Sequence, residues 1–85
     1  MKFLESIINM KLNSIQSNEL MGLAGQYGVS LTKQEADHVC LLLRGKNYNL
    51  FHTGQRNMVI QQIAGIIGQQ RAEQIEQLFL SLTGR

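Results

Sequence analysis

The sequence predicts an all-α fold, a compact single domain of four to five short helices spanning residues 1–85. Proline is absent, and Leu, Ile, Gln and Met are abundant, which is the composition of an α protein. Apolar residues recur with a 3.6-residue period in five segments, and no segment alternates with a period of two. Glycine, serine, threonine and asparagine separate these segments, and 85 residues is the length of one domain.

The first two helices are expected over residues 2–12 and 18–27. The first carries four large apolar residues on one face, Phe3, Leu4, Ile7 and Ile8. Ser17 is the predicted N-cap of the second, because a serine hydroxyl can accept from the free amides of a first helical turn. Gly28 stands where glycine commonly ends a helix.

The third helix, over residues 33–44, has the clearest signals. Thr32 and Glu35 have the spacing of a capping box, in which each side chain binds the backbone amide of the other residue. Four apolar residues follow at the spacing of one buried face, Ala36, Val39, Cys40 and Leu43. Gly45 then provides the usual helix stop. This helix is expected to be central to the fold.

The last two helices are expected over residues 54–67 and 70–82, after a loop at 46–52 that carries two apolar anchors. Thr53 is the predicted N-cap of the fourth helix, although Asn49 could start a first turn earlier, and Gly68 is expected to end or kink that helix. The predicted core positions of this pair are Val59, Ile60, Ile63, Ala64, Ile67, Ala72, Ile75, Leu78, Phe79 and Leu82.

Composition excludes several classes of protein. A single cysteine rules out a disulfide framework and suits a reducing compartment, so a cytoplasmic location is expected. The longest apolar run, 39–43, is far too short to cross a bilayer. The start of the chain lacks the apolar region of a signal peptide. A net charge of +2 favours no particular partner.

The sequence indicates no catalytic site, metal site or cofactor. His38 and Cys40 are two residues apart on one helix, so their side chains point to different sides. Cys40 lies among apolar neighbours, where a thiol acts as inert filling. No acid, base and nucleophile come together, and a non-enzymatic role is expected.

One candidate function rests on a basic segment, because no acidic residue occurs between Asp37 and Glu73. Basic and aromatic residues that could hold nucleic acid lie at Arg44, Lys46, Tyr48, Phe51 and Arg56. The alternative interpretation is that Arg44 and Lys46 complement the dipole at a helix C-terminus. The two aromatic rings would then belong to the core. Weak nucleic-acid binding is therefore the second functional hypothesis.

The leading hypothesis rests on surplus apolar residues, Leu41, Leu42, Ile66 and Leu80. Successive helical residues are 100° apart, so three consecutive leucines at 41–43 cannot all face one core. An exposed apolar patch marks a partner-binding surface. The sequence thus favours a non-enzymatic module that binds another protein or forms a homodimer.

The chain resembles the YqfT-like family of small Bacillus proteins over nearly its whole length. The resemblance rests on Glu5-Ser-Ile-Ile-Asn-Met-Lys-Leu-Asn13, on Leu43-Arg-Gly-Lys-Asn47 with Asn49 and Phe51, and on a closing Leu78-Phe79. It implies a bacterial cytoplasmic protein. The family has no assigned activity, so the resemblance supplies no catalytic or binding residues.

Overall fold

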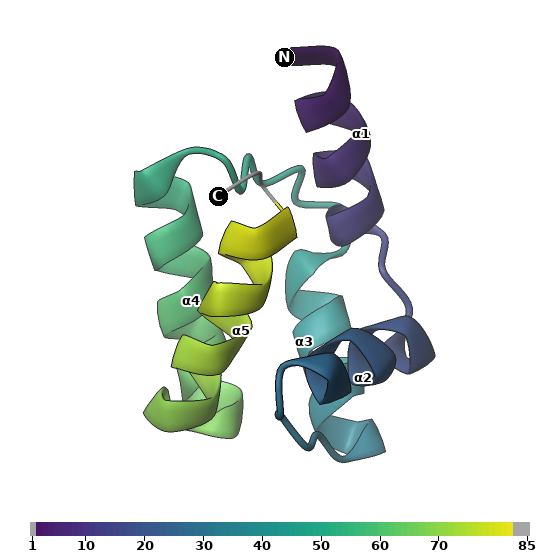
Figure 1. The fold of residues 1–85 in the computed structure, drawn as a ribbon, viewed down its shortest axis with the longest axis vertical. Helices are drawn as coiled ribbons and strands as arrows, with labels where there is room; N and C mark the ends of the chain where they lie inside the picture. The colour runs from purple at the N-terminus through teal and green to yellow at the C-terminus, as the bar shows by residue number, and fades with distance from the viewer. Residues whose placement is uncertain (1, 83–85) are drawn as a thin grey trace.

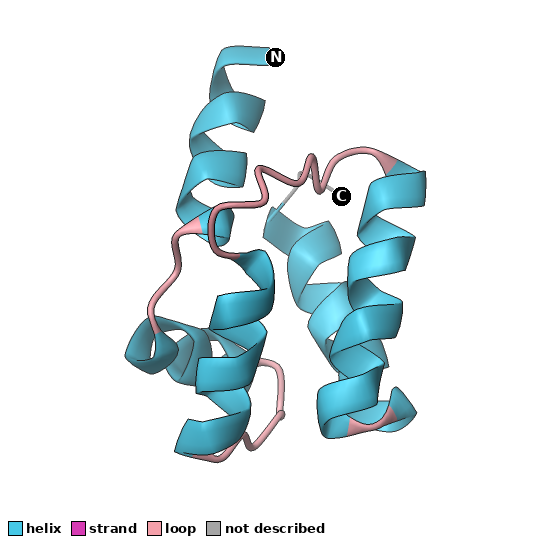
Figure 2. Ribbon diagram, turned by 180° about the vertical axis from the view of Figure 1, so that it is seen from behind, coloured by secondary structure: helices cyan, strands magenta, loops and turns pink. Residues whose placement is uncertain are grey.

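Five helices and no strand make up residues 2–82, the part of the chain that the computed structural model describes (Figure 1, Figure 2). Side chains are described for residues 5–82. The helices are α1 (Lys2–Asn13), α2 (Ser17–Gln26), α3 (Lys33–Leu43), α4 (Thr53–Ile67) and α5 (Gln69–Leu82). The predicted all-α single domain is confirmed, and each helix boundary lies within one residue of its predicted position. None of these helices has the length and apolarity needed to span a bilayer.

The helices pack as two pairs with α1 added at one end. Helices α4 and α5 run antiparallel side by side, and α2 lies against α3 (Figure 1). Helix α3 also packs on α4 and on α1, so it is central, as predicted. Helix α1 projects beyond the other four (Figure 1). The connection over residues 44–52 passes the base of α1 on its way from α3 to α4 (Figure 1, Figure 2).

The core is a single apolar cluster to which every helix contributes. Its buried members from the last three helices are the predicted ones, Ala36, Val39, Cys40, Leu43, Val59, Ile60, Ile63, Ile67, Ala72, Ile75, Leu78 and Phe79. Ala64 and Leu82 pack on it half-buried. The connection adds Leu50, which is fully buried. A residue outside any helix is thereby part of the core.

The predicted N-cap of α2 was wrong by one residue. Gln16 holds that position, and the Glu19 carboxylate accepts from the Gln16 amide at 3.2 Å. The hydroxyl of Ser17 instead donates to the Asp37 carboxylate on α3. A tertiary partner therefore outcompetes the local capping role of this serine.

The predicted N-cap of α4 was also wrong by one residue, because His52 caps the helix and Thr53 is its first residue. The His52 Nδ1 atom accepts from the Gln55 amide at 3.2 Å. The imidazole thus takes the role that was assigned to the threonine hydroxyl.

Left-handed backbone ends the helices where glycine was expected to end them. Gly68 has φ +90° and closes α4, and α5 begins at the next residue. Arg44 caps α3 through its backbone amide, which donates to Cys40 O, and Gly45 follows with φ +75°. Asn47 also adopts a positive φ, +55°, a conformation that asparagine tolerates better than most residues.

The predicted buried face of α1 is only partly correct. Ile7 is exposed, although it was expected to share a buried face with Ile8, which is half-buried. The cause is the projection of α1 beyond the other helices, which leaves its first turns few neighbours (Figure 1). The side chains of Phe3 and Leu4 lie outside the described residues.

Candidate functional site

Two asparagines of α1 bind the extended backbone of the connection. The Asn13 side chain accepts from the Tyr48 amide and donates to the Tyr48 carbonyl, both at 2.9 Å. One turn earlier, Asn9 Oδ1 accepts from the Leu50 amide at 2.9 Å, and Asn9 Nδ2 donates to Asn49 Oδ1 at 3.0 Å. The side chains at i and i+4 of one helix thereby replace a paired strand.

Every backbone polar group of residues 48–50 has a partner. Besides the groups bound by α1, the Asn49 amide donates to Gln55 Oε1 and the Leu50 carbonyl accepts from Arg56 Nη1. The Asn49 carbonyl accepts from the His52 amide. The backbone groups of a segment without regular structure are therefore satisfied as those of a paired strand would be. This fixed connection forms one wall of a surface hollow.

The first hollow lies between α1 and the connection and has a volume of about 490 Å³. Helix α1 supplies Ser6, Asn9, Met10 and Asn13, the following turn supplies Ser14, and the connection supplies Arg44, Gly45, Asn47, Tyr48 and Asn49. Most of this lining consists of amides and hydroxyls, with one thioether, one phenol ring and one guanidinium. It is equipped for hydrogen bonding and for one charged contact.

A second hollow of about 500 Å³ adjoins the first. Its lining is Ser14, Gln16, Ser17, Asn18, Lys33 and Arg44, so the two hollows share Ser14 and Arg44. No carboxylate occurs among the described residues that line either hollow. Arg44 thus borders both hollows, which together are called the depression below, and with Lys33 it gives their lining a positive charge.

Arg44 differs from the other two arginines of residues 5–82. Arg56 donates to the Leu50 carbonyl at 3.1 Å and has its Nε atom buried. Arg71 donates to four acceptors of the fold. The exposed side chain of Arg44 makes no hydrogen bond or ion pair with any described residue. It is the arginine that the fold leaves open to a ligand.

The residues predicted for nucleic-acid binding are only partly brought together. Arg44 and the half-buried Tyr48 line the first hollow. Lys46 is exposed and lines neither hollow, and its Nζ atom lies 3.5 Å from the Leu42 carbonyl. Phe51 and Arg56 are half-buried and also line neither.

The residues predicted for a protein interface lie on three helices and differ in exposure. Leu41 on α3 is 58% exposed. Leu42 on the same helix and Ile66 on α4 are half-buried and pack on the core. Leu80 on α5 is half-buried. Leu41 therefore offers the most apolar surface of the four.

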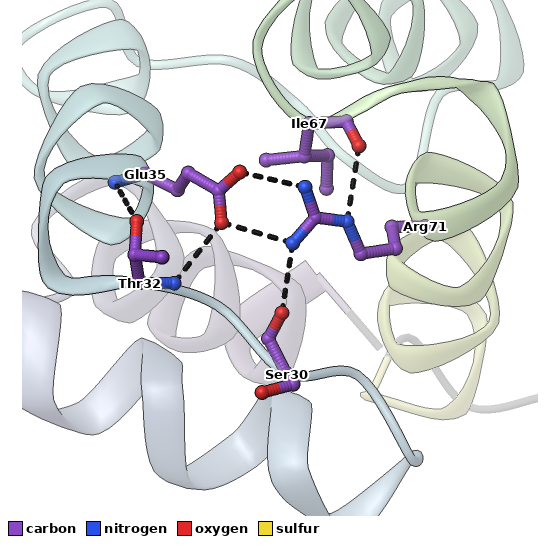
Figure 3. A network of polar contacts seen from close by, with 5 residues as sticks. All are labelled: Ser30, Thr32, Glu35, Ile67 and Arg71. Atoms are coloured by element: carbon purple, nitrogen blue, oxygen red, sulfur yellow. Dashed lines mark hydrogen bonds and ion pairs between the residues drawn. The ribbon is translucent and has the colours of Figure 1, made fainter.

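An ion pair of Glu35 with Arg71 joins the start of α3 to α5 (Figure 3). The guanidinium binds both carboxylate oxygens, at 2.6 and 2.9 Å, and also donates to the carbonyls of Ser30 and Ile67. The same carboxylate accepts from the Thr32 amide at 3.0 Å, which completes the predicted capping box. Hydrogen bonds from Arg71 and then from the Thr32 amide lower the pKa of Glu35 from 4.5 to about 2.

We expect the free energy of unfolding to depend on this carboxylate in acid. Because the native pKa of Glu35 is lowered, its contribution is present above pH 4.5 and is lost as the pH falls from 4.5 towards 2. Urea unfolding at a series of pH values should show wild type losing more stability over this interval than Glu35→Gln. Glu73→Gln, which removes a carboxylate from an exposed position of α5, is the control. Parallel pH curves for wild type and Glu35→Gln would contradict the prediction.

The thiol and its polar neighbours form a structural cluster between α2 and α3. Cys40 is buried as predicted, and burial raises the pKa of its thiol. Its Sγ atom lies 3.9 Å from the Ser17 hydroxyl. The hydrogen bond from Ser17 also lowers the pKa of Asp37. Within residues 5–82, no three histidine, cysteine or acidic side chains come together as a metal site would require.

Comparison with known proteins identifies the family. The family described as "Protein of unknown function (DUF2624)" matches residues 1–83. The chain belongs to the DUF2624 family. A relative in Bacillus subtilis (strain 168), "Uncharacterized protein YqfT", is 34% identical over 79 residues, which cover 93% of this chain and 94% of that protein. The predicted resemblance is confirmed. No solved structure matches the chain.

The two longer segments on which the resemblance rested meet at the first hollow of this DUF2624 domain. They are residues 5–13 and residues 43–47 with the nearby Asn49. Apart from Ser14 and Tyr48, every residue lining that hollow belongs to them. Sequence reasoning did not single out Asn9, Asn13 or Met10 as functional residues. The available signal was the repetition of asparagine at the end of α1 and in the connection.

Proposed function

We propose that this protein is a non-enzymatic protein-binding module whose binding surface surrounds the first hollow. One observation carries the proposal. The two most exposed large apolar side chains of residues 5–82 are Met10 on α1, at 66%, and Leu41 on α3, at 58%. Met10 lines the first hollow together with Arg44. Leu41 lies in the last turn of α3, three residues before Arg44, which caps that helix.

The residue types at this surface support protein binding. Methionine, tyrosine and arginine are enriched at protein interfaces, and Met10, Tyr48 and Arg44 line one hollow. Anchors of this kind contribute most when a rim of polar groups excludes water around them. The amides and hydroxyls of the lining supply such a rim. Leu42 can extend the apolar part of the surface, and Ile66 and Leu80 stay predictions for a contact elsewhere.

Site-specific photo-crosslinking tests the proposal. We expect a benzophenone amino acid in place of Leu41 to give a discrete protein adduct in the native cell. The matched control is the same substitution at Met58, which is 42% exposed on α4, a helix that contributes no residue to either hollow. Absence of an adduct from position 41 in a folded variant, or equal adducts from both positions, would contradict the proposal.

Sedimentation velocity across protein concentration separates the two kinds of partner. If the partner is a second copy, wild type should shift from monomer to dimer, and Leu41→Ser should shift less. If the partner is another protein, wild type stays monomeric, and the adduct mass exceeds that of the chain by the mass of that protein.

Nucleic-acid binding by Arg44, Lys46, Tyr48, Phe51 and Arg56 stays the alternative prediction. Its test is the salt dependence of oligonucleotide affinity, because each phosphate contact on a single strand contributes about −0.7 to the log–log slope. An apolar protein interface should respond little to salt.

A further inference from the structure

The charged side chains that line the depression around Arg44 indicate which class of ligand it can bind. Its only cations are Arg44 and Lys33, and the described lining has no carboxylate. Lys33 lies 3.5 Å from Asp37, so its charge is partly compensated by a neighbour. Arg44 has no such partner among residues 5–82. A guanidinium in this state favours a planar anion that it can bind through two parallel hydrogen bonds, such as a carboxylate.

The surroundings of Arg44 fit a peptide. Met10 presents an exposed thioether beside it, and methionine adapts its shape to varied apolar side chains. Asn47 lines the first hollow and Asn18 lines the second. The side-chain amides of both make no hydrogen bond within residues 5–82. Such amides can both donate to and accept from a peptide backbone.

We infer that this depression binds an acidic linear segment of a partner protein, with a carboxylate of the segment on Arg44 and a neighbouring apolar side chain on Met10. The inference rests on the proposed function and specifies the chemistry of its partner. Nucleic acid fits less well, because binding a strand requires several open cations in a row. Arg56 is held by the Leu50 carbonyl and Lys33 by Asp37, which leaves Arg44 as the open cation of the depression.

Selection from a library of random linear peptides displayed on phage, with the whole chain as bait, tests the inference. We expect the enriched peptides to be rich in Asp and Glu next to apolar residues. For a synthetic enriched peptide, fluorescence anisotropy should show that Arg44→Gln weakens binding about ten- to hundredfold, which corresponds to one hydrogen-bonded charge. Replacing the peptide's Asp and Glu by Asn and Gln should abolish the difference between wild type and Arg44→Gln.

Matched variants distinguish binding at this depression from non-specific effects of net charge and of exposed apolar surface. Lys46→Gln removes the same charge from a position outside both hollows, so it should weaken binding by no more than about fivefold. Met10→Ser should weaken binding, whereas Met58→Ser should not. The backbone cap at position 44 does not involve the arginine side chain, so Arg44→Gln should melt at the wild-type temperature.

The inference is overturned if no peptide is enriched, if the enriched peptides lack acidic residues, or if Arg44→Gln binds them as wild type does. Binding that depends on Met10 but not on Arg44 would overturn the inference and leave the proposed function standing. The proposed function itself is tested separately, by the crosslinking at position 41. Tighter binding of a thymidine oligonucleotide than of any acidic peptide, with dependence on Arg44, would assign the depression to nucleic acid instead.

Discussion

Replacing Leu50 by alanine should lower the free energy of unfolding by about 2–5 kcal/mol. Leu50 is fully buried in the core although it lies in the connection between α3 and α4. Truncation removes apolar contacts within the core and leaves a cavity there. The hydrogen bonds that Asn9 and Arg56 make to the Leu50 backbone hold the residue in place, so the chain cannot relax into the space. Urea unfolding followed by circular dichroism measures the loss.

Leu41→Ala is the matched control for this prediction, because it removes the same atoms from an exposed position. Surface substitutions of this kind usually change stability by no more than about 0.5 kcal/mol. A natural domain of this size is stable by about 4–13 kcal/mol, so Leu50→Ala would remove a large fraction of the total. Equal losses from the two variants would show that Leu50 is not a core residue.

Replacing Asn13 by alanine should lower the free energy of unfolding by about 1–3 kcal/mol. Asn13 is the one polar residue among the described side chains that is buried, with 7% exposure. Its loss leaves the amide and the carbonyl of Tyr48 without partners, and the Asn9 carbonyl loses a donor at 2.7 Å. Asn57→Ala, at an exposed position of α4, should leave stability nearly unchanged.

Asn13→Asp distinguishes lost hydrogen bonds from lost packing. The carboxylate can still accept from the Tyr48 amide, but it faces the carbonyl oxygens of Asn9 and Tyr48, which the native amide satisfies as a donor. The folded state should therefore raise the pKa of the introduced carboxyl, and the variant should gain stability relative to Asn13→Ala as the pH falls through that pKa. Equal pH dependence of the two variants would contradict this account.

Local signals in the sequence were sufficient to predict the helices. The capping box at Thr32 and Glu35 spans three residues, so no distant contact was needed to recognise it. Gly68 separates α4 from α5 because its backbone conformation is one that other residues adopt at a cost. The two wrong N-caps have different causes, a distant contact in one case and an unusual capping residue in the other. Ser17 bonds to an aspartate twenty residues away, and histidine, which caps α4, is not among the preferred capping residues.

The candidate site was beyond prediction for a different reason. Arg44 was recognised as a candidate, but its distinction from Arg56 and Arg71 depends on contacts that join distant parts of the chain. Asn9 and Asn13 bind a backbone 35 to 41 residues away, and contacts of side chains with backbone leave no periodic trace in a sequence. Periodicity reports which face of a helix is apolar, and it cannot report where an unpaired cation will lie.

The hydrogen bonds from the two asparagines of α1 also make it possible to measure how often α1 detaches from the connection. The amide hydrogens of Tyr48 and Leu50 are bonded to α1 side chains alone, whereas the amides within α3 and α4 are bonded inside their own helices. Exchange of these two hydrogens with solvent deuterium therefore requires α1 to leave the connection, but not the four-helix body to unfold. Their protection measures the free energy with which α1 docks, separately from the free energy of global unfolding. A partner that spans α1 and the connection would slow the exchange of both hydrogens together.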